Sequence, residues 1–174
     1  MTDTTETESA SERLARQAGK YLTFRLHKES YGIAVLQVRE IMRLPPITTV
    51  PRMPEHIKGV INLRGKIIPV IDLRLRFGMH GVADGDQTCV IVVQVSLKAD
   101  NSLQIGLIVD AVEEVANIGA ADIEETPQFG ANLDTAYILG MAKVKGAVKA
   151  LLDINQVVAG TTAASLEQSL GVAA

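Results

Sequence analysis

Two short apolar runs separated by a cationic corner constrain the fold more than any other part of this sequence. Residues 60–63 and 67–71 are mostly apolar, and the corner between them is Arg64-Gly65-Lys66. Apolar runs of this length on either side of a glycine-containing turn are typical of a β-hairpin. Such a hairpin carries its positive charge at an exposed tip, which favours a function based on surface contact.

The rest of the chain repeats this pattern of short strands and turns. It offers roughly nine or ten strand-like segments, with no long amphipathic helices recurring between them, which argues against a doubly wound parallel sheet. We therefore predict an all-β fold with short helical turns and a short C-terminal helix that begins after Asp153. One barrel of about ten strands and two barrels of about five strands each are both compatible with this pattern. The glycine-rich loop 78–87 is the expected divide between two barrels.

Composition excludes several classes of function. Apolar residues make up 47% of the chain and aromatic residues only 3%, so the core is expected to be aliphatic. The net charge of −3 and the scarcity of aromatic side chains argue against a nucleic-acid partner, which would require a basic face or stacking platforms. Cys89 is the single cysteine and is expected to act as a small buried apolar residue. We found no signal peptide and no apolar run long enough for a membrane helix, so a cytoplasmic location without membrane insertion is expected.

The two ends of the chain differ from its middle. Residues 1–19 are polar and lack apolar periodicity, so we predict a mostly disordered tail, although Ser9 and Glu12 resemble a capping box that could start a short helix. Residues 159–174 form a second tail, rich in Ala, Ser and Thr, with room for a loose helix around 165–170.

Motifs for catalysis, metal binding or cofactor binding are missing from the sequence. The three histidines, His27, His56 and His80, lie in separate predicted loops and outside any known ligand spacing. The adjacent carboxylates at 113–114 and 124–125 would point to opposite faces of a strand, so neither pair suits acid–base catalysis. We therefore expect no catalytic residues, no metal and no cofactor.

Isolated charges and glycines near the apolar strands remain as candidates. A guanidinium at Arg64 can form a forked bond with a partner's carboxylate, although a solvated turn residue would look the same in sequence. Glu40 is either an exposed strand carboxylate or one half of an interface pair. Gly59, Gly65 and Gly106 are explained most simply by positive φ or close backbone approach.

Several of these segments, taken in order, resemble one known family. The chain contains K-G-V-x-N-L-R-G at 58–65, I-P-V-x-D-L-R at 68–74, G-L-I-V-D at 106–110 and L-L-D-I at 151–154. Together they resemble CheW, the adaptor family of bacterial chemotaxis, over about residues 20–158. The resemblance implies two five-stranded SH3-like β-barrel subdomains around a shared interior. It also implies a protein without catalysis that couples chemoreceptors to the histidine kinase CheA.

The family also suggests which residues contact partners. By position, Val38, Glu40 and Arg64 line or flank the receptor-contacting surface, and Gly59, Gly65, Gly106 and Val109 belong to strands or turns near it. The implied partners are the helical cytoplasmic tip of a chemoreceptor, the regulatory domain of CheA and further CheW molecules in array rings. The chain is too short to add a response-regulator domain. An adaptor of a non-flagellar chemosensory pathway, a small-ligand-binding β-barrel and an enzyme using loop histidines stay open as alternatives.

Overall fold

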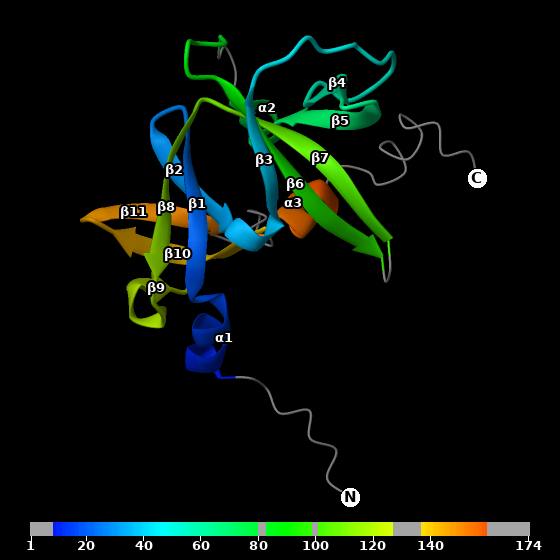
Figure 1. The fold of residues 1–174 in the computed structure, drawn as a ribbon. Coiled ribbons are helices and arrows are strands. Elements are labelled where there is room, and N and C mark those ends of the chain that lie inside the picture. The colour runs from blue at the N-terminus through cyan, green and yellow to red at the C-terminus, as the bar shows by residue number, and fades with distance from the viewer. Residues whose placement is uncertain (1–8, 80–82, 99–100, 127–136, 160–174) are drawn as a thin grey trace, which may run out of the picture.

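The computed structural model describes residues 9–79, 83–98, 101–126 and 137–159, which form two β-sheets and a few short helices (Figure 1). The first sheet has the strand order β8-β1-β2-β11-β10-β9 and the second the order β3-β6-β7-β5-β4. The strands of the first sheet are β1 (Gly19–Leu26), β2 (Glu29–Ala34), β8 (Ala111–Ile118), β9 (Ile123–Glu124), β10 (Ile138–Val144) and β11 (Ala147–Leu152). The strands of the second sheet are β3 (Val38–Arg43), β4 (Ile57–Leu63), β5 (Lys66–Asp72), β6 (Cys89–Lys98) and β7 (Asn101–Val109).

Helices are confined to short segments around the sheets. They are α1 (Ala10–Gln17), η1 (Val35–Gln37), α2 (Leu73–Arg76), η2 (Ala120–Asp122) and α3 (Ile154–Ala159). The prediction of an all-β fold with two subdomains and a short C-terminal helix is confirmed. None of the described helices is long and apolar enough to cross a membrane.

The order of the strands shows that one subdomain is inserted into the other. The chain builds β1 and β2, passes through η1 into the complete five-stranded sheet, and returns at Asp110 to build β8–β11. The loop between α2 and β6 therefore lies within the five-stranded subdomain. The divide predicted at 78–87 was wrong, because glycine content marks a loop but does not say which strands pair across it.

Three apolar clusters form the core, and one of them joins the two sheets. The largest lies between them and combines β1 side chains such as Phe24 with Ile91 and Leu107 of the other sheet and with Val157 of α3. Each sheet also has a smaller cluster of its own, around Leu151 in the first sheet and around several buried side chains in the second, namely Ile61, Ile68, Val70, Val90, Val92 and Ile108. The two subdomains are therefore filled by apolar side chains and share a core. The alternative of one hollow ten-stranded barrel was wrong.

The predicted hairpin between β4 and β5 is present, with a two-residue turn. Arg64 has φ 51° and Gly65 has φ 86°, which is the pattern of a type I′ turn, and the Asn62 side-chain oxygen accepts a hydrogen bond from the Gly65 N–H at 2.8 Å. The first sheet contains the same device between β10 and β11, where Lys145 has φ 51° and Gly146 has φ 81°. Each subdomain therefore presents a cation at the tip of a tight hairpin.

The N-terminal segment is more ordered than its composition suggested. Helix α1 is capped as the Ser9 hydroxyl accepts from the Glu12 N–H and the Glu12 carboxylate accepts from the Ser9 N–H, so the predicted capping box is confirmed. The helix packs against η2 and β9. The prediction of disorder was therefore wrong for 10–17, because tertiary contacts outweigh local composition. Residues 1–8, His80 and the tail 160–174 lie outside the described residues.

Candidate functional site

The tip of the β4–β5 hairpin and the edge strand β3 meet through an ion pair. The Arg64 Nη2 atom lies 2.8 Å from Glu40 Oε1, and the Arg64 side chain is 76% exposed while that of Glu40 is 27% exposed. Strands β3 and β4 are the two edges of the five-stranded sheet, so this contact brings both edges together as the sheet curls. We call the Arg64–Glu40 pair the exposed clasp.

The backbone at Arg64 is unusual for its residue type. Non-glycine residues rarely adopt φ near +50°, and the first position of a type I′ turn prefers Asn, Asp or Gly. The turn alone would therefore not select arginine. The same argument applies to Lys145, whose Nζ atom lies 2.8 Å from Glu114 Oε2 on β8, the edge strand of the other sheet. The two subdomains thus carry equivalent clasps.

Apolar side chains are exposed on the strands that carry the exposed clasp. Ile41 of β3 is 46% exposed and Ile67 of β5 is 56% exposed, whereas Val38 is half-buried and packs on the shared core. Arginine is enriched at protein interfaces, and exposed aliphatic side chains add apolar area. Ile41 follows Glu40 on β3, so the two side chains point to opposite faces of that strand. The exposed clasp and the strands next to it are suited to bind another protein by contact.

The remaining predicted site residues lie inside the framework. Gly59 has φ 145°, and a Cβ atom there would overlap the carbonyl oxygen of Thr48, which pairs with β4. Gly106 lies in β7 between β6 and β5, where a Cβ atom would come within 2.8 Å of Val90 Cγ1, and Val109 is fully buried. The structure therefore groups Glu40, Arg64 and Gly65 at the exposed clasp, with Val38 below it. Gly59, Gly106 and Val109 support the sheet.

Sequence reasoning missed the most buried charge in the described chain, Arg74. Its side chain is 2% exposed and bonds three carboxylates: Nε and Nη2 contact Asp72 at 2.9 Å, Nη2 contacts Asp84 at 2.8 Å, and Nη1 contacts Asp110 at 3.0 Å. These hydrogen bonds, first of all those with Asp72, raise the pKa of Arg74 beyond its already high ordinary value. The signal in the sequence was the pair of opposite charges two residues apart directly after an apolar run. We call Arg74, Asp72, Asp84 and Asp110 the buried hub.

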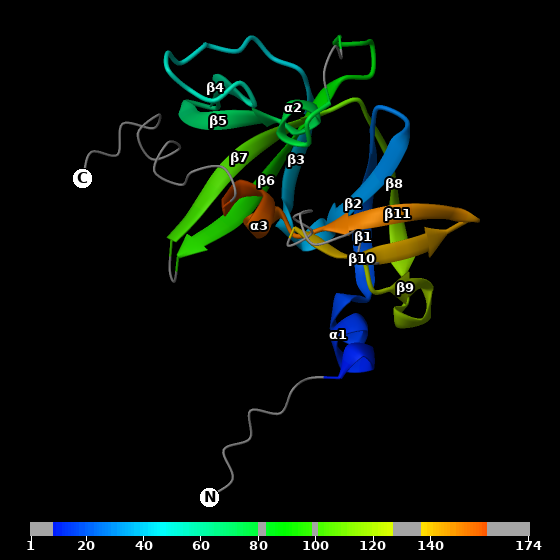
Figure 2. The same cartoon turned by 180° about the vertical axis from the view of Figure 1, so that it is seen from behind.

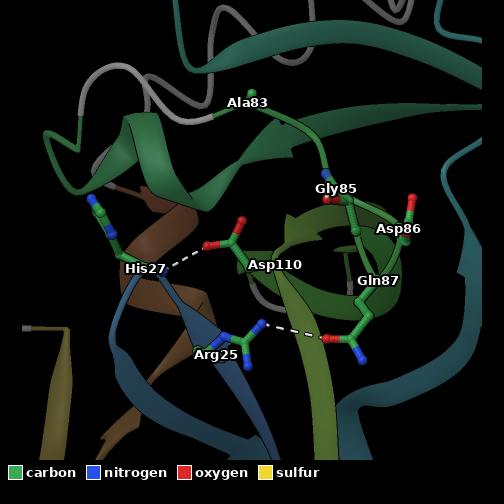
Figure 3. Close-up of a pocket in the computed structure, with 8 residues that line it drawn as sticks. Arg25, His27, Ala83, Gly85, Asp86, Gln87 and Asp110 are labelled. Atoms are coloured by element: carbon green, nitrogen blue, oxygen red, sulfur yellow. Dashed lines mark hydrogen bonds between the residues drawn. The ribbon is translucent and has the colours of Figure 1, made fainter.

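A polar depression, whose lining residues are drawn in Figure 3, includes Asp110 of the buried hub. It has a volume of about 540 Å³ and is lined by Arg25, His27, Asp110 and residues from 83–88. Arg25 Nη2 lies 3.4 Å from the Gln87 side-chain oxygen, and the His27 N–H donates to Asp110 Oδ2 at 2.6 Å. His56 is not among the lining residues, and its buried Nε2 atom has no hydrogen-bond partner among the described residues.

Within the described ranges, no group of three or more His, Cys, Asp or Glu side chains is arranged to hold a metal ion. Arg74 already binds Asp110, which lines the depression, and the neighbouring Asp84. In the part of the chain that the structure describes, the site therefore offers contact surfaces and no assembled set of catalytic groups.

Comparison with known proteins identifies the family of the chain. The CheW-like domain family model matches residues 20–161. A chemotaxis protein CheW from Klebsiella aerogenes is 36% identical over 137 residues, which cover 79% of this chain and 80% of that protein. A chemotaxis protein CheW from Rhizobium meliloti is 28% identical over 149 residues, covering 86% of this chain and 93% of that one. A crystal structure of the scaffolding protein TtCheW from Thermoanaerobacter tengcongensis matches with a TM-score of 0.70 and 37% identity, covering 80% of this chain and 92% of that one.

Proposed function

The chain belongs to the CheW family of chemotaxis scaffold proteins, and from this membership we propose that it couples chemoreceptors to the histidine kinase CheA. It would do so by contact alone, in the cytoplasm, at membrane-associated receptor arrays. The partners are the helical cytoplasmic tip of a receptor, the regulatory domain of CheA and further copies of the adaptor. Several relatives that match over most of the chain carry scaffold or chemotaxis names, which supports this proposal.

The single observation that carries the proposal is the exposed clasp. Arg64 is held on a rigid hairpin at the sheet edge, its guanidinium is 76% exposed, and Ile41 and Ile67 offer apolar area on the strands that carry the clasp. Arginine is enriched among the residues that dominate binding energy at interfaces. Because exposed ion pairs are worth little in water, about 0–1 kcal/mol, a partner carboxylate can compete with Glu40 for Arg64 at small cost.

Close packing of the two subdomains explains how binding of a receptor could regulate the kinase. The shared core packs both sheets against each other, and close-packed interiors transmit strain. A displacement of one subdomain on binding a partner would therefore displace the other. Signalling then needs only a difference in affinity between receptor states, because a ligand shifts an equilibrium by its differential binding. Val38 would contribute by supporting β3 from below. Gly59, Gly65, Gly106 and Val109 would contribute by fixing the strands and the turn.

The test is a titration of the purified protein against a receptor cytoplasmic fragment and against the CheA regulatory domain, each followed by calorimetry. We expect Arg64→Glu to weaken binding of the receptor fragment at least tenfold, which corresponds to about 1.4 kcal/mol. Lys145→Glu is the matched control, because it breaks the equivalent clasp on the other subdomain.

The control should leave affinity for the receptor fragment within about twofold, since a factor of two is only about 0.4 kcal/mol. Unchanged affinity of Arg64→Glu for both partners would contradict the proposal. Equal loss in both variants would point to a general effect of charge and would also contradict it.

A further inference from the structure

The connection between the two subdomains is thinnest at one residue. The chain passes from one sheet to the other through η1, none of whose residues is buried, and through Asp110, which alone separates β7 from β8 (Figure 2). A single-residue connection between strands of different sheets has only two soft dihedral angles to absorb a rotation. The hydrogen bonds that fix Asp110 therefore influence the relative orientation of the two sheets.

Asp110 is held from both sides by directional bonds. Its backbone N–H donates to the Arg25 carbonyl at 3.0 Å, and its Oδ2 atom accepts from the His27 N–H at 2.6 Å, so both partners belong to the six-stranded sheet and its first turn. Its Oδ1 atom accepts from Arg74 Nη1 at 3.0 Å, and Arg74 lies in α2, the helix that follows β5 of the five-stranded sheet. Figure 3 shows Asp110 pointing toward the His27 backbone.

Apolar packing constrains the angle between the two sheets less sharply than hydrogen bonds do. The shared core favours contact between the sheets, but the hydrophobic effect is non-directional. Hydrogen bonds fix both distance and angle, and those to charged groups are the stronger kind. The core thus holds the subdomains together, and directional bonds between them restrict their orientation. Besides those at Asp110, Arg76 donates to the Val157 carbonyl and the Ser96 N–H donates to the Asn155 side chain, but only Asp110 lies at the crossing point of the chain.

We propose that Asp110 and Arg74 are positioning residues that set the angle between the two subdomains. The consequence for coupling rests on the proposed function, because receptor and kinase would engage surfaces on a body whose two halves must keep a fixed relation. Asp84 binds the same guanidinium from an exposed loop, with its side chain 55% exposed, but it does not lie at the crossing point. It is therefore the natural control.

The informative substitution is Asp110→Asn. An amide has one acceptor oxygen and one donor nitrogen, so it can satisfy either the Arg74 guanidinium or the His27 N–H but places a donor against the other. Asp84→Asn removes a carboxylate charge from the same guanidinium and leaves both bonds at the crossing point intact. His27→Gly keeps the donating N–H and accepts the positive φ of 58°, so it tests whether the imidazole matters.

The experiment measures distances between spin labels on the two subdomains by pulsed electron paramagnetic resonance. Labels are placed at Ile67→Cys and Val148→Cys, both 56% exposed, with Cys89→Ser as background. This readout needs no binding partner, so its failure is distinguishable from failure of the proposed function. Thermal unfolding of each variant confirms that it is folded at the temperature of measurement.

We expect Asp110→Asn to shift or broaden the distance distribution, and Asp84→Asn and His27→Gly to superimpose on the parent protein. If Asp110→Asn does not fold, Asp110→Glu replaces it, since the longer side chain keeps the charge but must displace one of the two partners. A distribution identical to the parent's for the folded Asp110 variant would overturn the proposal. So would an equal change in the Asp84→Asn control.

Discussion

Two arginines ten positions apart in the sequence use the same chemistry in opposite surroundings. Arg64 forms one ion pair with Glu40 at the surface, where its side chain is 76% exposed. Arg74 bonds Asp72, Asp84 and Asp110 with its side chain 2% exposed. The exposed clasp is screened by water and can exchange partners, whereas the buried hub cannot release Asp72, whose side chain is only 3% exposed, without leaving a buried charge unpaired.

This difference shows which charged side chains can bind a partner and which stabilise the fold. A buried guanidinium that already satisfies three carboxylates has no capacity left for a partner. An exposed guanidinium on a rigid hairpin keeps its reach and loses little on exchange. Burial therefore separates the roles more clearly than residue type does.

The largest expected effect comes from removing the cation of the buried hub. Arg74→Met keeps most of the side-chain volume but leaves the Asp72 and Asp110 carboxylates without their cation. We therefore expect the free energy of unfolding to fall by about 3–5 kcal/mol. Urea denaturation followed by circular dichroism measures it. Arg64→Met is the comparison and should change stability by less than about 1 kcal/mol. Similar losses in both variants would remove the distinction between the two arginines.

An intermediate effect is expected at the glycines beneath and within the clasp. Gly59→Ala places a Cβ atom on the Thr48 carbonyl at a positive φ, so we expect a loss of about 3 kcal/mol from overpacking and backbone strain together. Gly65→Ala has open space around it and should cost only about 1–2 kcal/mol, the strain of the left-handed conformation. Thermal unfolding of both variants decides the order, and a larger loss at Gly65 would contradict it.

The smallest expected effect concerns His56, a half-buried histidine whose Nε2 atom is buried without a hydrogen-bond partner among the described residues. Burial, and then the nearby Arg76 charge, lower the pKa of His56 below its ordinary value. The unfolded chain therefore binds a proton at higher pH than the folded one, and stability should fall as pH drops below about 6.5.

Urea unfolding at pH 7.5 and pH 5.5 measures this fall. His56→Gln should reduce it, whereas His27→Gln, which keeps His56, should retain it. An identical pH dependence in His56→Gln and the parent protein would show that His56 does not contribute.

Much of the fold could be predicted because local signals and tertiary structure agree. The hairpin at Arg64-Gly65, the turn at Lys145-Gly146 and the capped helix after Asp153 all carry their own turn or cap residues. The insertion of one subdomain into the other could not be predicted from such signals. It depends on β2 pairing with β11 and β5 with β7, contacts between segments far apart in sequence.

The site was predicted less evenly than the fold. Sequence alone left Glu40 as an exposed strand carboxylate or one half of an interface pair. It could not show the ion pair with Arg64 within the chain, because that pair forms only when the sheet curls and its two edges meet. Gly59 and Gly106 proved to be positions where a neighbouring atom excludes a side chain, as the simplest explanation held. Arg74 was overlooked although Asp72 lies two residues before it, because the sequence does not show how deeply this pair is buried or that Asp84 and Asp110 join it.

The most direct test of the account is a charge swap across the exposed clasp. The double variant Glu40→Arg with Arg64→Glu can re-form the ion pair within the chain while reversing the charge offered to a partner. If Arg64 acts by contacting the receptor, the swapped protein should fold as stably as the parent and still bind the receptor fragment at least tenfold more weakly, a difference of about 1.4 kcal/mol. Recovery of parental affinity in the swapped protein would show that the clasp serves structure alone and would contradict the account.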